Sequence, residues 1–317
     1  MLTTERIKAA LDQYWQKRAQ KTYPASSIRA SAIGHPCLRA ISYPLVRPDL
    51  ESKTPDVERL FHQGNIHEED ILKVLKEAGV YEKFKLIEAG VLKKWMIKAR
   101  KYPEMGWIPV SGKVDAILED LTDRSLAVVE VKAVSGNSFK QMLTWSKFWE
   151  ALYRRKWYSQ LQIYLFQMEI EQGFLIIKNR DTGEELIYEV KIDFEHTEEL
   201  LQKAEEVWYY YTIKGELHPQ KYEAPETCLH CNFAHDCLPN LEFQPLTVEI
   251  QETLNELLLE REKYKDSYKE YNRLDREIKK ILNSSDKKEE GSRTIVGDFL
   301  IEYKNGRWKI TSLIEEE

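Results

Sequence analysis

Three charged residues stand in two segments that otherwise read as apolar β-strands. Asp115 follows Gly112-Lys113-Val114, and Glu130 and Lys132 interrupt the run Leu126–Val134. Glu130 and Lys132 are two residues apart, so they project from the same face of a strand. Carboxylates bind hard cations such as Mg²⁺ or Mn²⁺, and a neighbouring lysine can polarise a metal-bound water or an anionic substrate. The alternative for Glu130 and Lys132 is a salt-bridged pair on a half-exposed strand.

Two further patterns place polar side chains on expected helices. His67 stands in Gly64-Asn65-Ile66-His67-Glu68, within a helix predicted for Asp56–Ala78. Gln160 and Tyr164 are four residues apart on another expected helix and therefore share one of its faces. A single histidine is more often a surface or core residue than a metal ligand, and the Gln–Tyr pair has an ordinary solvent-edge alternative. These patterns gain weight only in combination with the charged strands.

The four cysteines, Cys37, Cys228, Cys231 and Cys237, suggest a second metal centre, because three of them fall within ten residues. Disulfides are rare in reducing compartments, where clustered thiols more often bind a metal or a cluster. The cysteines alone leave two assignments open, an iron–sulfur cluster and a structural zinc site. A mixed zinc site would add nearby histidines from the set His35, His230 and His235.

The remaining pattern predicts the elements that must position these residues. Helices are expected at Thr4–Arg18, Pro36–Tyr43, Asp56–Ala78 (with Gly79 as the stop), Phe139–Leu152, Trp157–Ile170 and His196–Lys214. Strands are expected at Val91–Ile97, Val110–Leu118, Leu126–Val134, Gly173–Lys178 and Glu185–Ile192. If the second and third strands pair as a hairpin, Asp115 and Glu130 converge. The expected fold is α/β, a mixed central sheet flanked by helices.

The chain changes character after Pro245, which suggests one domain over 1–245 and an extension over 246–317. Leu246–Leu282 is a charged helical stretch that reads either as a coiled coil or as a helical hairpin, because Arg261 and Asp275 interrupt its apolar seam. Asn305-Gly306 predicts a β-hairpin behind it.

Charge and hydropathy restrict the function classes. The 317 residues carry 47 basic and 53 acidic side chains, a net charge of −6, which excludes a wholly basic nucleic-acid binder but not a local basic groove. Arg154, Arg155 and Lys156, directly before the Gln160 helix, are the candidate groove. No run of eighteen apolar residues and no apolar signal core is present, so we expect no membrane partner and a cytoplasmic, possibly virus-encoded, protein.

Taken in order, these motifs resemble the PD-(D/E)XK nuclease superfamily, with its restriction-endonuclease-like fold, in its RecB-like branch. That branch includes CRISPR-associated RecB-type exonucleases, the AddB nuclease domain and exonuclease V. The likeness covers roughly residues 31–237 and rests on Gly64–Glu68, Gly112–Asp115, Glu130–Lys132, Gln160–Tyr164 and the cysteine spacing. No proline precedes Asp115, so only the Gly-x-x-Asp form of that motif is present.

The resemblance implies a metal-dependent DNA exonuclease that acts on ends or single strands in recombination, repair or CRISPR-type processing. His67, Asp115, Glu130 and the Val131 carbonyl would bind Mg²⁺ or Mn²⁺, Lys132 would assist the attacking water, and Gln160 and Tyr164 would position the DNA strand. A 4Fe–4S cluster would be held by the four cysteines. Alternatives are a non-catalytic DNA-binding adaptor or a structure-specific endonuclease, and 246–317 could bind duplex DNA, a protein partner or another copy.

Overall fold

The computed structural model describes residues 3–21, 25–51, 53–149, 152–220, 228, 231–237, 248–264, 268–284, 291–297, 299–304 and 306–312. The chain divides into two compact units, Met1–Lys221 and Tyr222–Glu317. The carboxylate–lysine residues belong to the first unit. The predicted extension from residue 246 lies within the second, together with the segment that carries three of the cysteines.

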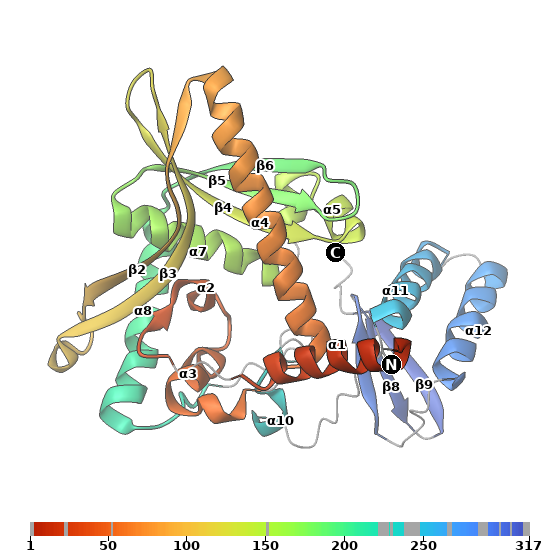
Figure 1. The fold of residues 1–317 in the computed structure, drawn as a ribbon. Helices are drawn as coiled ribbons and strands as arrows, with labels where there is room; N and C mark the ends of the chain where they lie inside the picture. Colours follow the sequence, from red (N-terminus) through yellow and green to blue (C-terminus); the bar gives the residue numbers. More distant parts are fainter. Residues whose placement is uncertain are drawn as a thin grey trace. The chain divides into compact units, whose positions relative to one another are not determined.

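A mixed sheet forms the centre of the first unit (Figure 1). Its strands are β1 (Ile28–Arg29), β2 (Phe84–Lys98), β3 (Trp107–Asp120), β4 (Leu126–Val134), β5 (Gln172–Asn179) and β6 (Glu185–Lys191). The order is β1-β3-β4-β5-β6, and β2 pairs with β3 to form a long ribbon. The pairs β1–β3 and β4–β5 are parallel, and the other three are antiparallel. The expected mixed α/β architecture is therefore confirmed.

Helices flank this sheet (Figure 1). Their bounds are α1 (Thr4–Ala19), α2 (Ala30–Ile33), α3 (Leu38–Val46), α4 (Pro55–Glu82), α5 (Gly136–Lys140), α6 (Trp145–Trp149), α7 (Leu152–Met168) and α8 (Phe194–Tyr209), followed by a π-helical turn at Tyr210–Lys214; 3₁₀ turns lie at Pro48–Leu50 and Pro103–Met105. The Thr54 side chain caps α4, whose first residue is Pro55, a combination that favours helix starts.

Two helix predictions are wrong in detail. α4 continues past Gly79 and ends where Lys83 adopts a left-handed conformation, with φ of 57°. The predicted helix Phe139–Leu152 is instead two short helices, α5 and α6, whose N-termini are capped by Ser135 and Thr144. Hydroxyl caps compete with helix propagation, which explains why the segment breaks where its apolar spacing suggests continuity.

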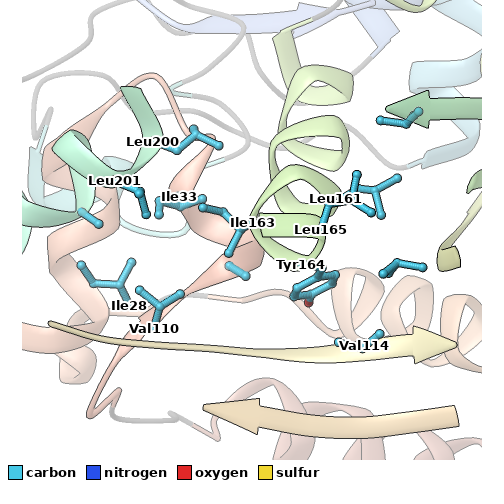
Figure 2. Close-up of a cluster of buried hydrophobic side chains, with 14 of the residues drawn as sticks. Ile28, Ile33, Val110, Val114, Leu161, Ile163, Tyr164, Leu165, Leu200 and Leu201 are labelled. Atoms are coloured by element: carbon cyan, nitrogen blue, oxygen red, sulfur yellow. The ribbon is translucent and has the colours of Figure 1, made fainter. Parts of the chain in front are cut away.

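Two apolar clusters bury the two sides of the sheet. The larger cluster packs α2, α7 and α8 against β1 and β3, and it contains Ile33, Ile163 and Leu200 of the helices and Val110 of β3 (Figure 2). The smaller cluster packs Ile71 of α4 against Val129 and Val131 of β4 and Ile176 of β5. The sheet is therefore buried on both faces, as the near-continuous apolar run of β4 predicts.

The second unit contains a helical pair and a small sheet. Its elements are α10 (Ala234–Cys237), α11 (Val248–Lys263), α12 (Tyr268–Ser284), β7 (Arg293–Val296), β8 (Phe299–Lys304) and β9 (Arg307–Ser312). Leu254, Leu258, Ile278 and Leu282 bury their side chains with Phe299 and Ile301, so both helices contribute to one core with the sheet. The hairpin alternative for Leu246–Leu282 is thus the observed one. The β8–β9 pair forms as Asn305-Gly306 predicts, and β7 was not expected.

Candidate carboxylate and lysine site

The site begins where β3 and β4 separate. Their antiparallel ladder runs from Glu119 opposite Leu126 to Ala116 opposite Val129. One residue further on, an oxygen of the Asp115 carboxylate accepts a hydrogen bond from the backbone N–H of Val131 at 2.8 Å. The Asp115 side chain thus takes the place of a ladder carbonyl. The predicted hairpin pairing, and the convergence of Asp115 on the Glu130–Lys132 segment, are confirmed.

The alternation of β3 is interrupted at this point. Val114 packs in the larger cluster with α7, whereas Ala116 packs in the smaller cluster under α4. A regular strand would place these two residues on the same face. The irregularity explains how Asp115 can turn toward β4 instead of pointing straight to one side of the sheet.

Glu130 is fully buried on β4, and its Oε1 pairs with the ammonium group of Lys132. Its other oxygen, Oε2, has no hydrogen-bond partner in the part of the chain that the structure describes. Burial raises the pKa of Glu130 to about 8, and the nearby Asp115 charge adds to this while Lys132 opposes it. Burial also raises the pKa of Asp115 to about 6. A buried carboxylate oxygen without a partner is costly, and a cation would relieve that cost.

Helix α4 supplies a third carboxylate that the sequence analysis missed. Glu68 forms an ion pair with Lys113 at 2.6 Å, and its charge contributes to the raised pKa values of Asp115 and Glu130. His67 instead acts electrostatically on Asp70. Glu68 lies three, four and seven residues before Ile71, Leu72 and Leu75, the side chains that α4 packs against the sheet. That helical spacing was the signal that could have identified it.

Gln160 and Tyr164 of α7 lie together as predicted, and the Tyr164 hydroxyl contacts the backbone of β3. Gln160 Nε2 donates to the Tyr164 hydroxyl at 3.0 Å, and that hydroxyl donates to the carbonyl oxygen of Lys113, also at 3.0 Å. Both side chains are buried, and burial raises the pKa of Tyr164. A methyl group at Gly112 would lie 2.5 Å from the Tyr164 ring and hydroxyl. The glycine of the motif therefore makes room for the tyrosine that fixes β3.

The basic run before Gln160 divides between core and surface. Arg154 is buried, and its guanidinium donates to the carbonyl oxygens of Gln141 and Lys147 and to the Gln141 side chain. Every one of these bonds ties α7 to the segment before it, so Arg154 has a structural role, and DNA binding by this residue stays a prediction. Arg155 is exposed and donates to the Trp149 carbonyl, and Lys156 is half-buried.

The cysteines are distributed over both units. Cys37 is buried at the start of α3, with its Sγ 3.7 Å from the Gln220 carbonyl oxygen. Cys228, Cys231 and Cys237 follow one another along successive backbone turns, in which Cys231 N–H donates to the Cys228 carbonyl and Cys237 N–H to that of Phe233. His230, one of the alternative zinc ligands, lies outside the described residues.

Among the described residues, no group of three or more His, Cys, Asp or Glu side chains is arranged to hold a metal ion. The structure therefore does not bring His67, Asp115 and Glu130 together as a three-ligand set, and it does not support the 4Fe–4S cluster. The structure does bring Asp115 and Glu130 together, and Glu130 Oε2 has no hydrogen-bond partner among the described residues. Carboxylate oxygens of this kind are suitable ligands for Mg²⁺ or Mn²⁺. In the described part of the chain, no helix is both long and apolar enough to cross a membrane.

Several solved structures resemble parts of this chain at low sequence identity. The protein SSO0001 has a crystal structure that matches 74% of this chain and 96% of its own, with 16% identity and a TM-score of 0.46. An alkaline exonuclease from Laribacter hongkongensis matches 64% of this chain and 94% of its own, at 11% identity and a TM-score of 0.41. A phage-related exonuclease from Haemophilus somnus matches 60% and 94%, at 10% identity and 0.36. No family model and no curated protein matches the sequence.

Proposed function

We propose that this chain is a divalent-metal-dependent DNA exonuclease. The observation that carries the proposal is the pair of buried carboxylates at the point where β3 and β4 separate. Among the described residues Glu130 Oε2 lacks a hydrogen-bond partner, and Lys132 lies beside it. A charged pair kept only for stability would be expected to satisfy both oxygens, because leaving one unsatisfied costs free energy. The order of motifs along the chain supports the assignment of the substrate as DNA.

In this proposal Asp115 and Glu130 hold the cation, and Glu68 of α4, paired with Lys113, adds negative charge near them. The cation would neutralise charge on the scissile phosphate and lower the pKa of a bound water. Lys132 orients that water or the phosphate, since its ammonium group already lies against Glu130. Gln160 and Tyr164 act as positioning residues, because their hydrogen bonds hold the β3 backbone at Lys113. His67 and the Val131 carbonyl remain candidate ligands.

The decisive experiment compares two conservative substitutions with a matched control. Asp115→Asn and Glu130→Gln should each reduce hydrolysis of end-labelled linear DNA in Mn²⁺ by about 100-fold or more, the size of a lost preorganised electrostatic contact. Glu119→Gln, on the same strand but paired with Arg124 away from the site, should retain activity. If all three variants cleave like the wild type, the site assignment is wrong.

The same assay separates the two rival functions. A non-catalytic adaptor on this fold would release no nucleotides from linear DNA in Mg²⁺ or Mn²⁺, while still binding it. A structure-specific endonuclease would cut a covalently closed circle, which an exonuclease leaves intact. Release of mononucleotides from linear DNA only, abolished by EDTA, is the result that the exonuclease proposal requires.

We also propose that Cys37, Cys228, Cys231 and Cys237 hold a 4Fe–4S cluster. The support is chemical, since four thiolates are the usual ligands of such a cluster and three of these come from one short run of turns. Protein purified without oxygen should be brown and contain about four iron atoms per chain if this ligand set is occupied as usual. Stoichiometric zinc in colourless protein would instead favour the structural zinc site.

A further inference from the structure

Strand β2 of the β2–β3 ribbon is basic in a chain that is acidic overall. β2 alone carries four lysines and one glutamate, Lys85, Lys93, Lys94, Lys98 and Glu88, whereas the whole chain has a net charge of −6. β2 pairs along its length with β3, from Phe84 opposite Asp120 to Lys98 opposite Trp107. The β2 strand runs beside β3 and past the other strands of the sheet (Figure 1). From Val91 to Lys98 the pairing with β3 is continuous, so Lys93, Lys94 and Lys98 are carried on a paired two-stranded surface.

One face of this ribbon is open to solvent. From Leu92 onward the β2 side chains alternate, with Trp95 and Ile97 packed against the larger apolar cluster and their neighbours exposed. Directly opposite residues of an antiparallel pair share a face, so the register assigns exposed side chains of both strands to the solvent face. They are Leu92, Lys94, Met96, Lys98, Trp107 and Lys113. Three of these are lysines and none is acidic.

The lysines of this solvent face differ in their partners. Lys113 is paired with Glu68 at the candidate site. Lys93, on the other side of β2, is paired with Glu88. Neither Lys94 nor Lys98 has a carboxylate within ion-pair distance among the described residues. Their charge is thus available to an external anion without first breaking an internal contact.

The solvent face leads directly to the candidate site. Lys113 lies opposite Leu92 at one end of it and stands two residues before Asp115 on the same strand. Trp107, at the other end, is six residues away, which corresponds to about 20 Å of extended chain. That length matches about six base pairs at roughly 3.4 Å each. A polyanion that lies along this face therefore arrives at the carboxylates.

We propose that the solvent face of the β2–β3 ribbon binds the double-stranded part of the DNA substrate and leads its end toward Asp115 and Glu130. The inference rests on the proposed function for what happens at that end. A two-stranded ribbon is of a size that the major groove admits, and lysines contact phosphates as point charges. Single-strand sites instead stack successive bases on several aromatic rings, and Trp107 is the one aromatic side chain exposed on this face.

The test measures binding separately from cleavage. Fluorescence anisotropy in EDTA would follow wild-type protein, Lys94→Ala and Lys98→Ala on a labelled 20-base-pair duplex and on the labelled single strand, over a range of salt. Each substitution should lower the slope of log K against log salt by about 0.9 for the duplex and weaken binding roughly eight-fold at 0.1 M salt. Lys191→Ala is the matched control, because Lys191 is an exposed lysine on β6, the opposite edge strand.

Each outcome decides one question. Unchanged duplex slopes for Lys94→Ala and Lys98→Ala would overturn the ribbon proposal, even if the wild-type protein degrades DNA in Mn²⁺. If Lys94→Ala and Lys98→Ala weakened binding to the single strand but not to the duplex, the proposal would also be overturned, in favour of a single-strand path. Reduced duplex slopes in a protein that does not cleave would support the ribbon and refute the exonuclease. Thermal unfolding of each variant should match the wild type, since both lysine side chains are exposed.

Discussion

Replacing Gly112 by alanine is the sharpest test of how the site is built. The added methyl group would lie 2.5 Å from the Tyr164 ring and hydroxyl, so the buried ring has to move. Its movement would break the hydrogen bonds from Gln160 and to the Lys113 carbonyl, at about 1 kcal/mol each. Overpacking of a well-filled core adds about 1–3 kcal/mol. We therefore expect Gly112→Ala to lower the free energy of unfolding by about 3–5 kcal/mol.

The control is Gly64→Ala, the same substitution inside α4. A methyl group there has no neighbour within 4 Å, so relief of the glycine entropy cost should stabilise the protein by roughly 0.5–1 kcal/mol. The assay is urea unfolding followed by tryptophan fluorescence. All of the eight tryptophans except Trp308 lie in the first unit, so the signal reports mainly on that unit.

A double-mutant cycle with Tyr164→Phe identifies the cause. Removing the hydroxyl removes one of the three close contacts, so Gly112→Ala should cost about 1–2 kcal/mol less in the Tyr164→Phe background. Strictly additive effects would show that the two residues do not meet. A neutral or stabilising Gly112→Ala would refute the placement of α7 on β3.

Three further substitutions test other parts of the structure. Arg154→Ala should destabilise the first unit by about 3 kcal/mol, because several buried groups lose their partner, whereas Arg155→Ala should change stability by less than about 0.5 kcal/mol. Burial lowers the pKa of His196, so the unfolded chain is protonated first, and stability should fall as pH drops through about 6.5. His196→Gln should flatten that dependence in urea unfolding. Gly297→Ala should destabilise the second unit by about 1–2 kcal/mol, since φ there is +56° and the new methyl group would displace the Asn255 side chain.

Three results would contradict these expectations. Equal stability of the Arg154→Ala and Arg155→Ala variants would show that Arg154 is not held in the core, and would favour DNA binding by its side chain. Parallel pH profiles of wild type and His196→Gln between pH 7.5 and 5.5 would show that this histidine titrates normally in the fold. A Gly297→Ala protein with unchanged circular dichroism and melting would contradict the approach of α11 to the turn after β7.

Much of the fold could be predicted because the spacing of apolar residues and local turn motifs indicate most of its helices and strands. The nine residues of β4 are apolar apart from Glu130 and Lys132, a pattern that predicts a strand buried on both faces. The spacing of Gln160 and Tyr164 follows from the helical repeat, and Asn305-Gly306 encodes a hairpin through its turn geometry. Each of these signals involves residues close together in the chain.

The roles of Glu68 and Arg154 depended on contacts between segments far apart in the sequence. His67 and Glu68 are adjacent on one helix, and which of them meets Asp115 depends on how α4 is rotated against the sheet. Arg154 is buried where its guanidinium satisfies the carbonyl oxygens of Gln141, just after α5, and of Lys147, in the last turn of α6. The sequence by itself determined which residue types lie on which strands and helices. Only tertiary packing decided which of them meet, because helix rotation and strand separation are set by the whole core.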